Sequence, residues 1–123
     1  ELKESKLRAN PSPADEAAVL VREGETILGK IKDSDYVIAM EVEGKQLDSE
    51  ELSKKLQSTF DTNSSTIDFI IGGSLGLSDE VKRRADYGLS FSKLTFPHQM
   101  VRVMLVEQIY RAFKISNGET YHK

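Results

Sequence analysis

Three polar segments in the last third of the chain carry residue types that could bind or transform a ligand. A glycine-rich turn at 71–77 and a Ser/Thr-rich segment at 89–99 each follow an apolar stretch, and the chain ends in Tyr121, His122 and Lys123. Glycines let backbone approach a ligand closely. Hydroxyls and backbone groups are uncharged and can form hydrogen bonds with the edge of a heterocycle. Two polar loops at the ends of apolar strands therefore predict a ligand pocket.

The glycine turn does not fit the common phosphate-binding patterns. A Walker loop needs Lys after its last glycine, and the dinucleotide fingerprint needs Gly-x-Gly-x-x-Gly. Gly72-Gly73-Ser74-Leu75-Gly76 has neither arrangement. Phosphate cradling is therefore disfavoured, and the residues alone leave a purely structural turn as an open alternative.

Composition limits the class of protein. With 123 residues, 38% hydrophobic and 30% charged, the chain is expected to form one soluble domain over 1–123. No apolar run approaches the roughly twenty residues of a membrane span. The absence of cysteine excludes disulfides, thiolate zinc sites and a cysteine nucleophile, and we also expect no metal site. A cytoplasmic location fits these features.

Charge is distributed unevenly along the chain. Residues 1–80 hold 9 basic and 17 acidic groups, whereas residues 81–123 hold 8 basic and 3 acidic groups. The net charge of residues 81–123 is therefore +5, although that of the whole chain is -3. This local excess indicates a surface that could bind phosphate groups. The alternative is an excess of Lys and Arg on solvated helix faces.

Capping residues and hydrophobic periodicity predict alternating helices and strands. Ser12 before Pro13 is typical of a helix start, and Asp48 with Glu51 resembles a capping box. The expected elements are helix 13–32, strand 35–42, turn 43–45, helix 48–60, strand 66–71, short helix 78–85, strand 87–91 and a long helix from 97 to about 117. This order predicts an α/β fold with a mostly parallel sheet and flanking helices.

The order of these segments resembles the bacterial ribosomal RNA large-subunit methyltransferase H family, of the SPOUT class. The resemblance runs from about Pro11 to Lys123, and it is densest at 69–78, 89–99, 107–113 and the terminal Tyr-His-Lys. It implies methylation of N3 of a pseudouridine in 23S rRNA with S-adenosylmethionine. It also implies a SPOUT-type α/β fold with a C-terminal trefoil knot, and a homodimer.

One departure from the family concerns the start of the chain. Family members usually begin with a further strand and helix, carrying a Val-Gly-Lys turn, before the region that Glu1 opens here. We therefore expect the 1–123 domain to lack that strand and helix.

The resemblance implies a role for particular residues. The cofactor would be bound by Met40, Gly72, Phe91, Ser92, Lys93, Leu94, Thr95 and Phe96. Catalytic roles would fall to His98, Tyr121 and His122, and RNA contacts to Arg102, Arg111 and Lys123. Tyr121 could stack on a base, and His122 and Lys123 could hold phosphate.

Simpler alternatives stand beside these roles. Met40 could be an ordinary core residue, and His98 could form a structural hydrogen bond instead of accepting a proton. Arg111 lies four residues after Glu107 and could pair with it. Core or dimer packing is expected for Met100, Val103, Met104 and Phe113.

Two other functional classes remain open at this point. One is a non-catalytic module that binds RNA or the ribosome, and the other is a small-molecule α/β enzyme that uses the same glycine pocket. No residue is a certain catalytic base, and solvent is an alternative proton acceptor.

Overall fold

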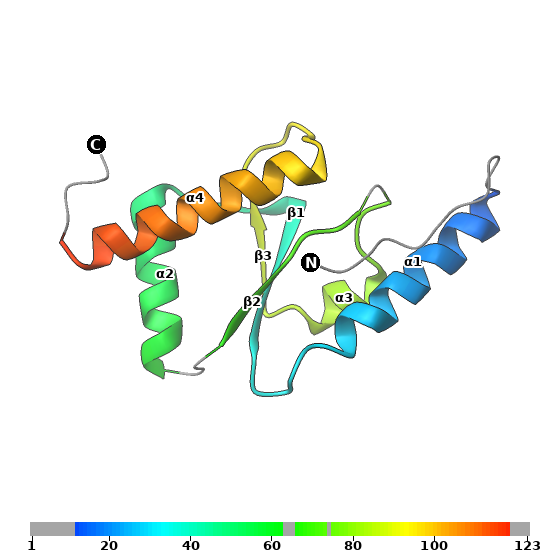
Figure 1. Cartoon of the computed structure of the whole chain (residues 1–123), viewed down its shortest axis with the longest axis horizontal. Helices are drawn as coiled ribbons and strands as arrows, with labels where there is room; N and C mark the ends of the chain where they lie inside the picture. The colour runs from blue at the N-terminus through cyan, green and yellow to red at the C-terminus, as the bar shows by residue number, and fades with distance from the viewer. Residues whose placement is uncertain (1–11, 63–65, 74, 119–123) are drawn as a thin grey trace.

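The computed structural model describes residues 12–62, 66–73 and 75–118, in which a parallel sheet lies between two pairs of helices (Figure 1). The elements in order are α1 (Pro13–Leu28), β1 (Tyr36–Gln46), α2 (Ser49–Thr62), β2 (Ile67–Ile70), α3 (Asp79–Arg84), β3 (Tyr87–Ser90) and α4 (His98–Ser116). Within the described residues the sheet has the strand order β2-β1-β3, and both pairs are parallel. The expected α/β architecture with a parallel sheet is therefore confirmed.

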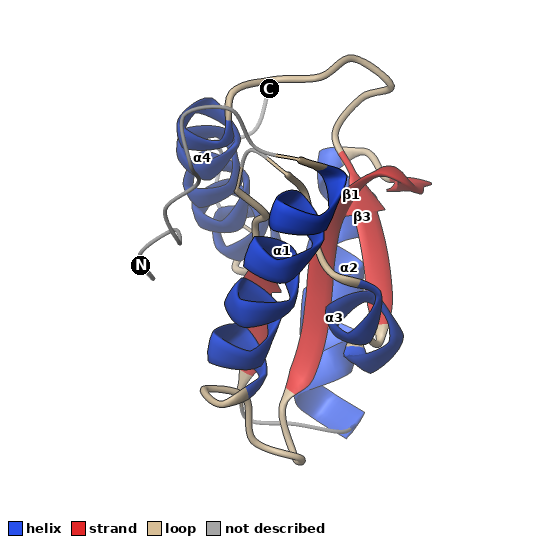
Figure 2. Cartoon of the chain, turned by 90° about the vertical axis from the view of Figure 1, so that its right-hand side faces the viewer, coloured by secondary structure: helices blue, strands red, loops and turns tan. Residues whose placement is uncertain are grey.

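Strand β1 is buried on both faces. Its side chains alternate, so that Val37 and Ala39 face α1 and α3, whereas Ile38 faces α2 and α4. Figure 2 shows the two helix layers in front of and behind the sheet. The first layer adds Ile70, Leu77 and Val81 to the core, and the second adds Leu52, Leu56, Leu89 and Ala112. This double burial accounts for the nearly continuous apolar centre of the strand.

The predicted helix starts are confirmed by their caps. The backbone N–H of Asp15 donates to the Ser12 hydroxyl at 3.1 Å, and the Ser12 N–H donates to the Asp15 carboxylate at 2.9 Å. Asp48 and Glu51 form the same reciprocal pair at 2.7 and 2.8 Å. Each cap satisfies backbone donors that the first helical turn leaves without partners.

The expected end of the first helix was wrong. α1 ends at Leu28, with Gly29 as its C-cap, and does not reach Lys32. The N–H of Lys32 donates instead to the carboxylate of Asp35 at 3.1 Å. This local turn competes with further helix and leads the chain into β1.

The turn expected at 43–45 was also wrong, because β1 continues through these residues to Gln46. Leu89 of β3 lies opposite both Met40 and Lys45, so β1 bulges between these two positions. A Cβ atom on Gly44 would lie 2.7 Å from the carbonyl carbon of Gly88. Glycine therefore permits a close approach of two strands here, not a reversal of the chain.

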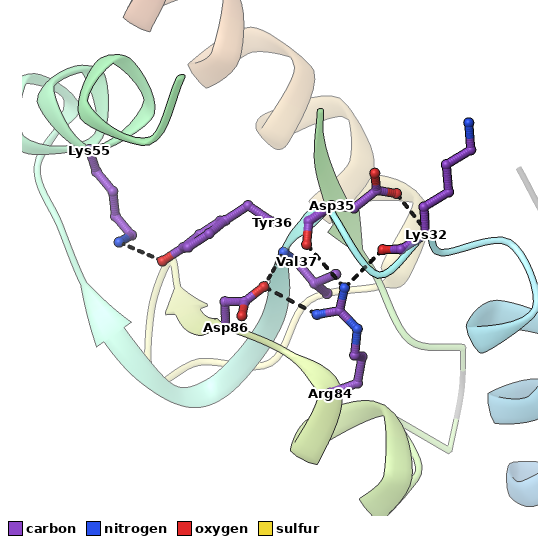
Figure 3. Close-up of polar contacts among 7 residues, drawn as sticks. All are labelled: Lys32, Asp35, Tyr36, Val37, Lys55, Arg84 and Asp86. Atoms are coloured by element: carbon purple, nitrogen blue, oxygen red, sulfur yellow. Dashed lines mark hydrogen bonds and ion pairs between the residues drawn. The ribbon is translucent and has the colours of Figure 1, made fainter. Parts of the chain in front are cut away.

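A polar cluster ties α3 to the start of β1 (Figure 3). The guanidinium of Arg84 donates to the backbone carbonyls of Lys32 and Asp35 at 3.1 and 3.0 Å, and to the carboxylate of Asp86 at 3.2 Å. Asp86 also accepts from the N–H of Val37 at 2.8 Å. These bonds hold the amino end of the central strand.

On the opposite layer, Lys55 of α2 reaches the same edge of the sheet (Figure 3). Its ammonium donates to the Tyr36 hydroxyl at 3.0 Å and lies 3.9 Å from the ring centroid of Tyr87. Both the polar contact and the cation–π contact bind α2 to the amino ends of β1 and β3.

We expect Arg84→Ala to lower the free energy of unfolding by about 1.5–3 kcal/mol, because it removes charge-assisted bonds to the backbone carbonyls of Lys32 and Asp35. Urea unfolding measures the change. Arg83→Ala is the matched control, since Arg83 is exposed on the same helix, and its effect should stay within about 0.5 kcal/mol. Equal losses in the two variants would contradict a special role for Arg84.

Asp68 and Asp35 form a carboxyl pair beside this cluster. Asp68 lies opposite Val37 in the sheet, and its Oδ2 atom has no hydrogen-bond partner among the described residues. Burial and the neighbouring Asp35 raise the pKa of Asp68 from 3.8 to about 6. The hydrogen bond with Asp68 and the N–H of Lys32 lower the pKa of Asp35. A proton on Asp68 would therefore satisfy both carboxyl groups.

The raised pKa of Asp68 predicts a loss of stability with rising pH. Between about pH 4 and 6 the folded protein binds more protons at Asp68 than the unfolded chain does, so the free energy of unfolding falls through this range. Asp68→Asn should remove that fall and stabilise the protein at pH 7 by about 1–3 kcal/mol. At pH 4 the gain should be much smaller, because Asp68 is then largely protonated in the folded protein. Chemical unfolding at both pH values measures the difference, and an unchanged pH slope in the variant would contradict it.

Candidate functional site

A cavity of about 530 Å³ opens beside the carboxyl ends of β2 and β3 and the bulge of β1. It is bordered by residues 40–43 of β1, by the glycine turn after β2, by the loop after β3 and by the start of α4. Parallel strands bring their carboxyl ends to one edge of a sheet, which is where open α/β sheets bind ligands. The volume lies within the range of about 300–1,000 Å³ that is usual for small-molecule sites.

The glycine turn forms one wall of this cavity. The N–H of Gly76 donates to the carbonyl of Gly73 at 3.0 Å, and Gly76 has a φ of 82° that favours glycine. A Cβ atom on Gly72 would lie 2.6 Å from the carbonyl oxygen of Gly76. We had expected glycine at position 72 to make room for a ligand. The clash shows that the backbone of the turn by itself already requires glycine there.

The loop after β3 forms the facing wall and is shaped by its own hydroxyls. Ser90 is buried and donates through its hydroxyl to the carbonyl of Ser92 at 2.9 Å. The Ser92 hydroxyl in turn accepts from the N–H of Leu94 at 3.0 Å. These two bonds fold the loop back on itself and leave its next residues beside the cavity.

Most of the predicted cofactor residues border this one cavity. They come from the middle of β1 and from the segments after β2 and β3, and they include Met40, Gly72, Phe91, Ser92, Leu94, Thr95 and Phe96. Lys93 is exposed and does not line the cavity. Met40 also packs against the core formed with Ile38, so the core interpretation of this residue holds as well.

The predicted catalytic and RNA residues do not form one cluster in the described part of the chain. His98 opens α4 and borders the cavity. It also borders a second cavity of about 660 Å³ on the α1 side of the glycine turn, together with Arg102. Tyr121, His122 and Lys123 lie outside the described residues.

Arg111 lies farther along α4 and is paired. Its Nε atom donates to the carboxylate of Glu107 at 2.9 Å, and its terminal nitrogen also contacts this carboxylate. The ion pair expected from the four-residue spacing is therefore confirmed. A contact of Arg111 with RNA would have to compete with this pair.

The sequence analysis missed the charged residues that line the cavity. Glu41 and Glu43 follow Met40 where β1 bulges, and Lys82 approaches from α3. Glu41 is a charged residue directly after the apolar run 36–40 of the strand, and this position was the signal that could have identified it. Among the described residues, no group of three or more acidic or imidazole side chains could hold a metal ion.

α4 presents an exposed apolar face. Its buried residues are Leu105 and Ala112, whereas large fractions of its other apolar side chains are exposed. The exposed fractions are 50% for Met100, 70% for Val103, 62% for Val106, 51% for Tyr110 and 45% for Phe113. Of the two interpretations offered for Met100, Val103 and Phe113, core packing is therefore wrong. No helix in the described ranges has the length and hydrophobicity needed to cross a bilayer.

Known proteins resemble this chain over its whole length. A family described as predicted SPOUT methyltransferase matches residues 1–122. A protein from Clostridioides difficile is 55% identical, and proteins from Clostridium botulinum and Streptococcus thermophilus are 54% identical; each is named Ribosomal RNA large subunit methyltransferase H. Each match covers all of this chain and 77% of the relative. This chain therefore belongs to the ribosomal RNA large subunit methyltransferase H family of SPOUT methyltransferases.

Proposed function

We propose that the protein transfers a methyl group from S-adenosylmethionine to N3 of a pseudouridine in 23S rRNA of the ribosome. One observation carries this proposal: Met40 at the bulge of β1, the glycine turn after β2 and the loop at 91–96 after β3 border one cavity. The chain also belongs to a family of ribosomal RNA methyltransferases. A ribosomal substrate would place the enzyme in the cytoplasm.

The residues of the cavity suit an adenosyl ligand. Met40, Leu89 and Phe91 offer apolar surface to the faces of a purine. Backbone groups and the Thr95 hydroxyl in the loop after β3 can form hydrogen bonds with its edge, since such groups read heterocycles without charge. Bound there, S-adenosylmethionine would supply an electrophilic methyl group.

The protein's own contribution to the reaction is mainly positioning. Methyl transfer needs the attacking N3 atom held in line at a short distance, and this alone can supply much of the rate enhancement. The N3 proton must also leave. His98 borders the cavity and could accept it, with solvent as the alternative acceptor. Tyr121 and His122 remain proposed contributors from the end of the chain.

We propose that the RNA is held by Arg102, Arg111 and Lys123 through its phosphates. Arg102 borders the second cavity, on the other side of the glycine turn from the proposed cofactor site. We also propose the trefoil knot and the homodimer of the SPOUT class. The exposed apolar face of α4 supports the dimer, because such a face is favourable only when another surface covers it.

We expect Gly72→Ala to weaken S-adenosylmethionine binding by at least about tenfold, because the new Cβ would displace the Gly76 backbone and with it one cavity wall. Calorimetry measures the affinity, and far-ultraviolet circular dichroism checks the fold. Gly29→Ala is the matched control. A Cβ there would lie 3.4 Å from the nearest atom and far from the cavity, so affinity should not change.

Two results would contradict the proposed function in different ways. Wild-type protein that does not bind S-adenosylmethionine would favour the non-catalytic ribosome-binding module. A folded Gly72→Ala protein with undiminished affinity would remove the glycine turn from the site. Ser92→Ala, which removes the bond to the N–H of Leu94, tests the facing wall if the glycine variant does not fold.

We expect Val103→Asp to raise the dimer dissociation constant at least about a hundredfold, since a two-fold interface would bury the carboxylate in both subunits. Sedimentation over a range of protein concentrations measures this constant. Val21→Asp on α1 is the control, because Val21 is also half-exposed but lies on another surface. The dimer proposal fails if wild-type protein is a fully active monomer at micromolar concentration.

A further inference from the structure

The wall of the proposed cofactor cavity carries a carboxylate that the structure itself does not neutralise. Glu41 is partly buried, directly follows Met40 at the bulge of β1, and lines the cavity. Within the described part of the chain it has no hydrogen-bond or ion-pair partner. The other charged side chains of the lining, Glu43 and Lys82, are exposed, so Glu41 is the least solvated of the three.

Gly88 of β3 determines where this carboxylate lies. A Cβ atom on Gly88 would lie 2.6 Å from Oε2 of Glu41, so the carboxylate occupies the space that a side chain at this position would need. The next residue, Leu89, begins the part of β3 that lines the cavity. The Glu41 carboxylate is therefore seated against the strand that leads into the cofactor loop.

We propose that the Glu41 carboxylate recognises the positive sulfonium of the methyl donor and thereby distinguishes it from the product. This inference rests on the proposed function. S-adenosylmethionine carries a positive charge at sulfur, and S-adenosylhomocysteine has a neutral sulfur with the same ribose, adenine and amino-acid groups. A carboxylate near the sulfur therefore favours the donor over the product and promotes product release.

Burial explains why Glu41, and not Glu43, carries this role. The attraction between two charges grows as the local dielectric constant falls, so a partly buried carboxylate discriminates charge better than an exposed one. Glu43 and Lys82 also line the cavity but are exposed, so water screens their charges more strongly.

The proposal also predicts different effects of losing this carboxylate on KM and on kcat. Positive charge on sulfur disappears as the methyl group leaves, so Glu41 stabilises the bound donor at least as well as the transition state. Loss of the charge should raise KM for S-adenosylmethionine without lowering kcat. A residue that only maintained the shape of the cavity would lower kcat as well.

Calorimetry with three ligands tests the proposal on Glu41→Gln, which keeps the size of the side chain. S-adenosylmethionine should lose about tenfold in affinity, S-adenosylhomocysteine less than about threefold, and methylthioadenosine, which has neutral sulfur and no amino-acid group, should be unaffected. Glu25→Gln on the exposed side of α1 makes the same change in net charge and should alter none of the three affinities.

A second variant moves the carboxylate without removing it. Gly88→Ala should push the end of the Glu41 side chain aside. The cost in stability should be small, because this side chain is flexible. The affinity of this variant for S-adenosylmethionine, relative to its affinity for S-adenosylhomocysteine, should fall less than in Glu41→Gln. The double variant should resemble Glu41→Gln alone, since the displaced group is then already uncharged.

The possible results are distinct. Equal losses for all three ligands would overturn the proposal and assign Glu41 to the shape of the cavity or to the ribose. Equal losses for the donor and S-adenosylhomocysteine, with methylthioadenosine unaffected, would overturn it in favour of the ammonium group. Unchanged affinities would remove Glu41 from the site. Wild-type protein that binds none of the three would instead refute the proposed function.

Discussion

The burial of β1 between two parallel neighbours is the constraint on which the rest of the structure depends. Val37, Ile38 and Ala39 have no exposed surface, and burial of large apolar side chains contributes about 1.5–3 kcal/mol each. Once β2 and β3 pair in parallel with the first half of this strand, both of them end on the same side of the sheet. The cavity follows from that direction, because the segments after β2 and β3 leave the sheet there, beside Met40 of β1.

The amino and carboxyl ends of the strands carry different groups. At the amino edge, Arg84 and Asp86 hold the strand starts with direct bonds. At the carboxyl edge, the cavity is lined by glycine backbone, by the hydroxyl-bonded loop, by apolar side chains and by the charged side chains of Glu41, Glu43 and Lys82. Strong internal pairing at that edge would satisfy the groups that a ligand must contact. Stability and binding are therefore supplied by opposite ends of the same strands.

Local signals predicted the elements well, and contacts between distant segments limited the rest. Ser12 and Asp48 predicted their helix starts because a cap depends only on nearby residues. Gly44 was misinterpreted because a glycine signals a turn or a close strand approach equally well, and only the neighbour Gly88 decides between them. Asp68 and Glu41 gave no periodic signal, since their importance comes from Asp35 and from the cavity. The two loops for which the resemblance implies cofactor binding do border one cavity, because parallel strands bring the segments that follow them to one edge of the sheet.

The fold shows which of the charged residues in the second part of the chain are paired and which are exposed. Arg111 contributes less than a sequence count implies, because Glu107 already neutralises it. The exposed cations Lys82, Arg83 and Lys93 lie on α3 and on the loop after β3, and Lys82 lines the cavity itself. Glu41 and Glu43 line the same cavity, so its lining carries no net positive charge. A phosphate-binding surface would therefore lie beside this cavity and not within it, for example where the exposed Arg102 borders the second cavity.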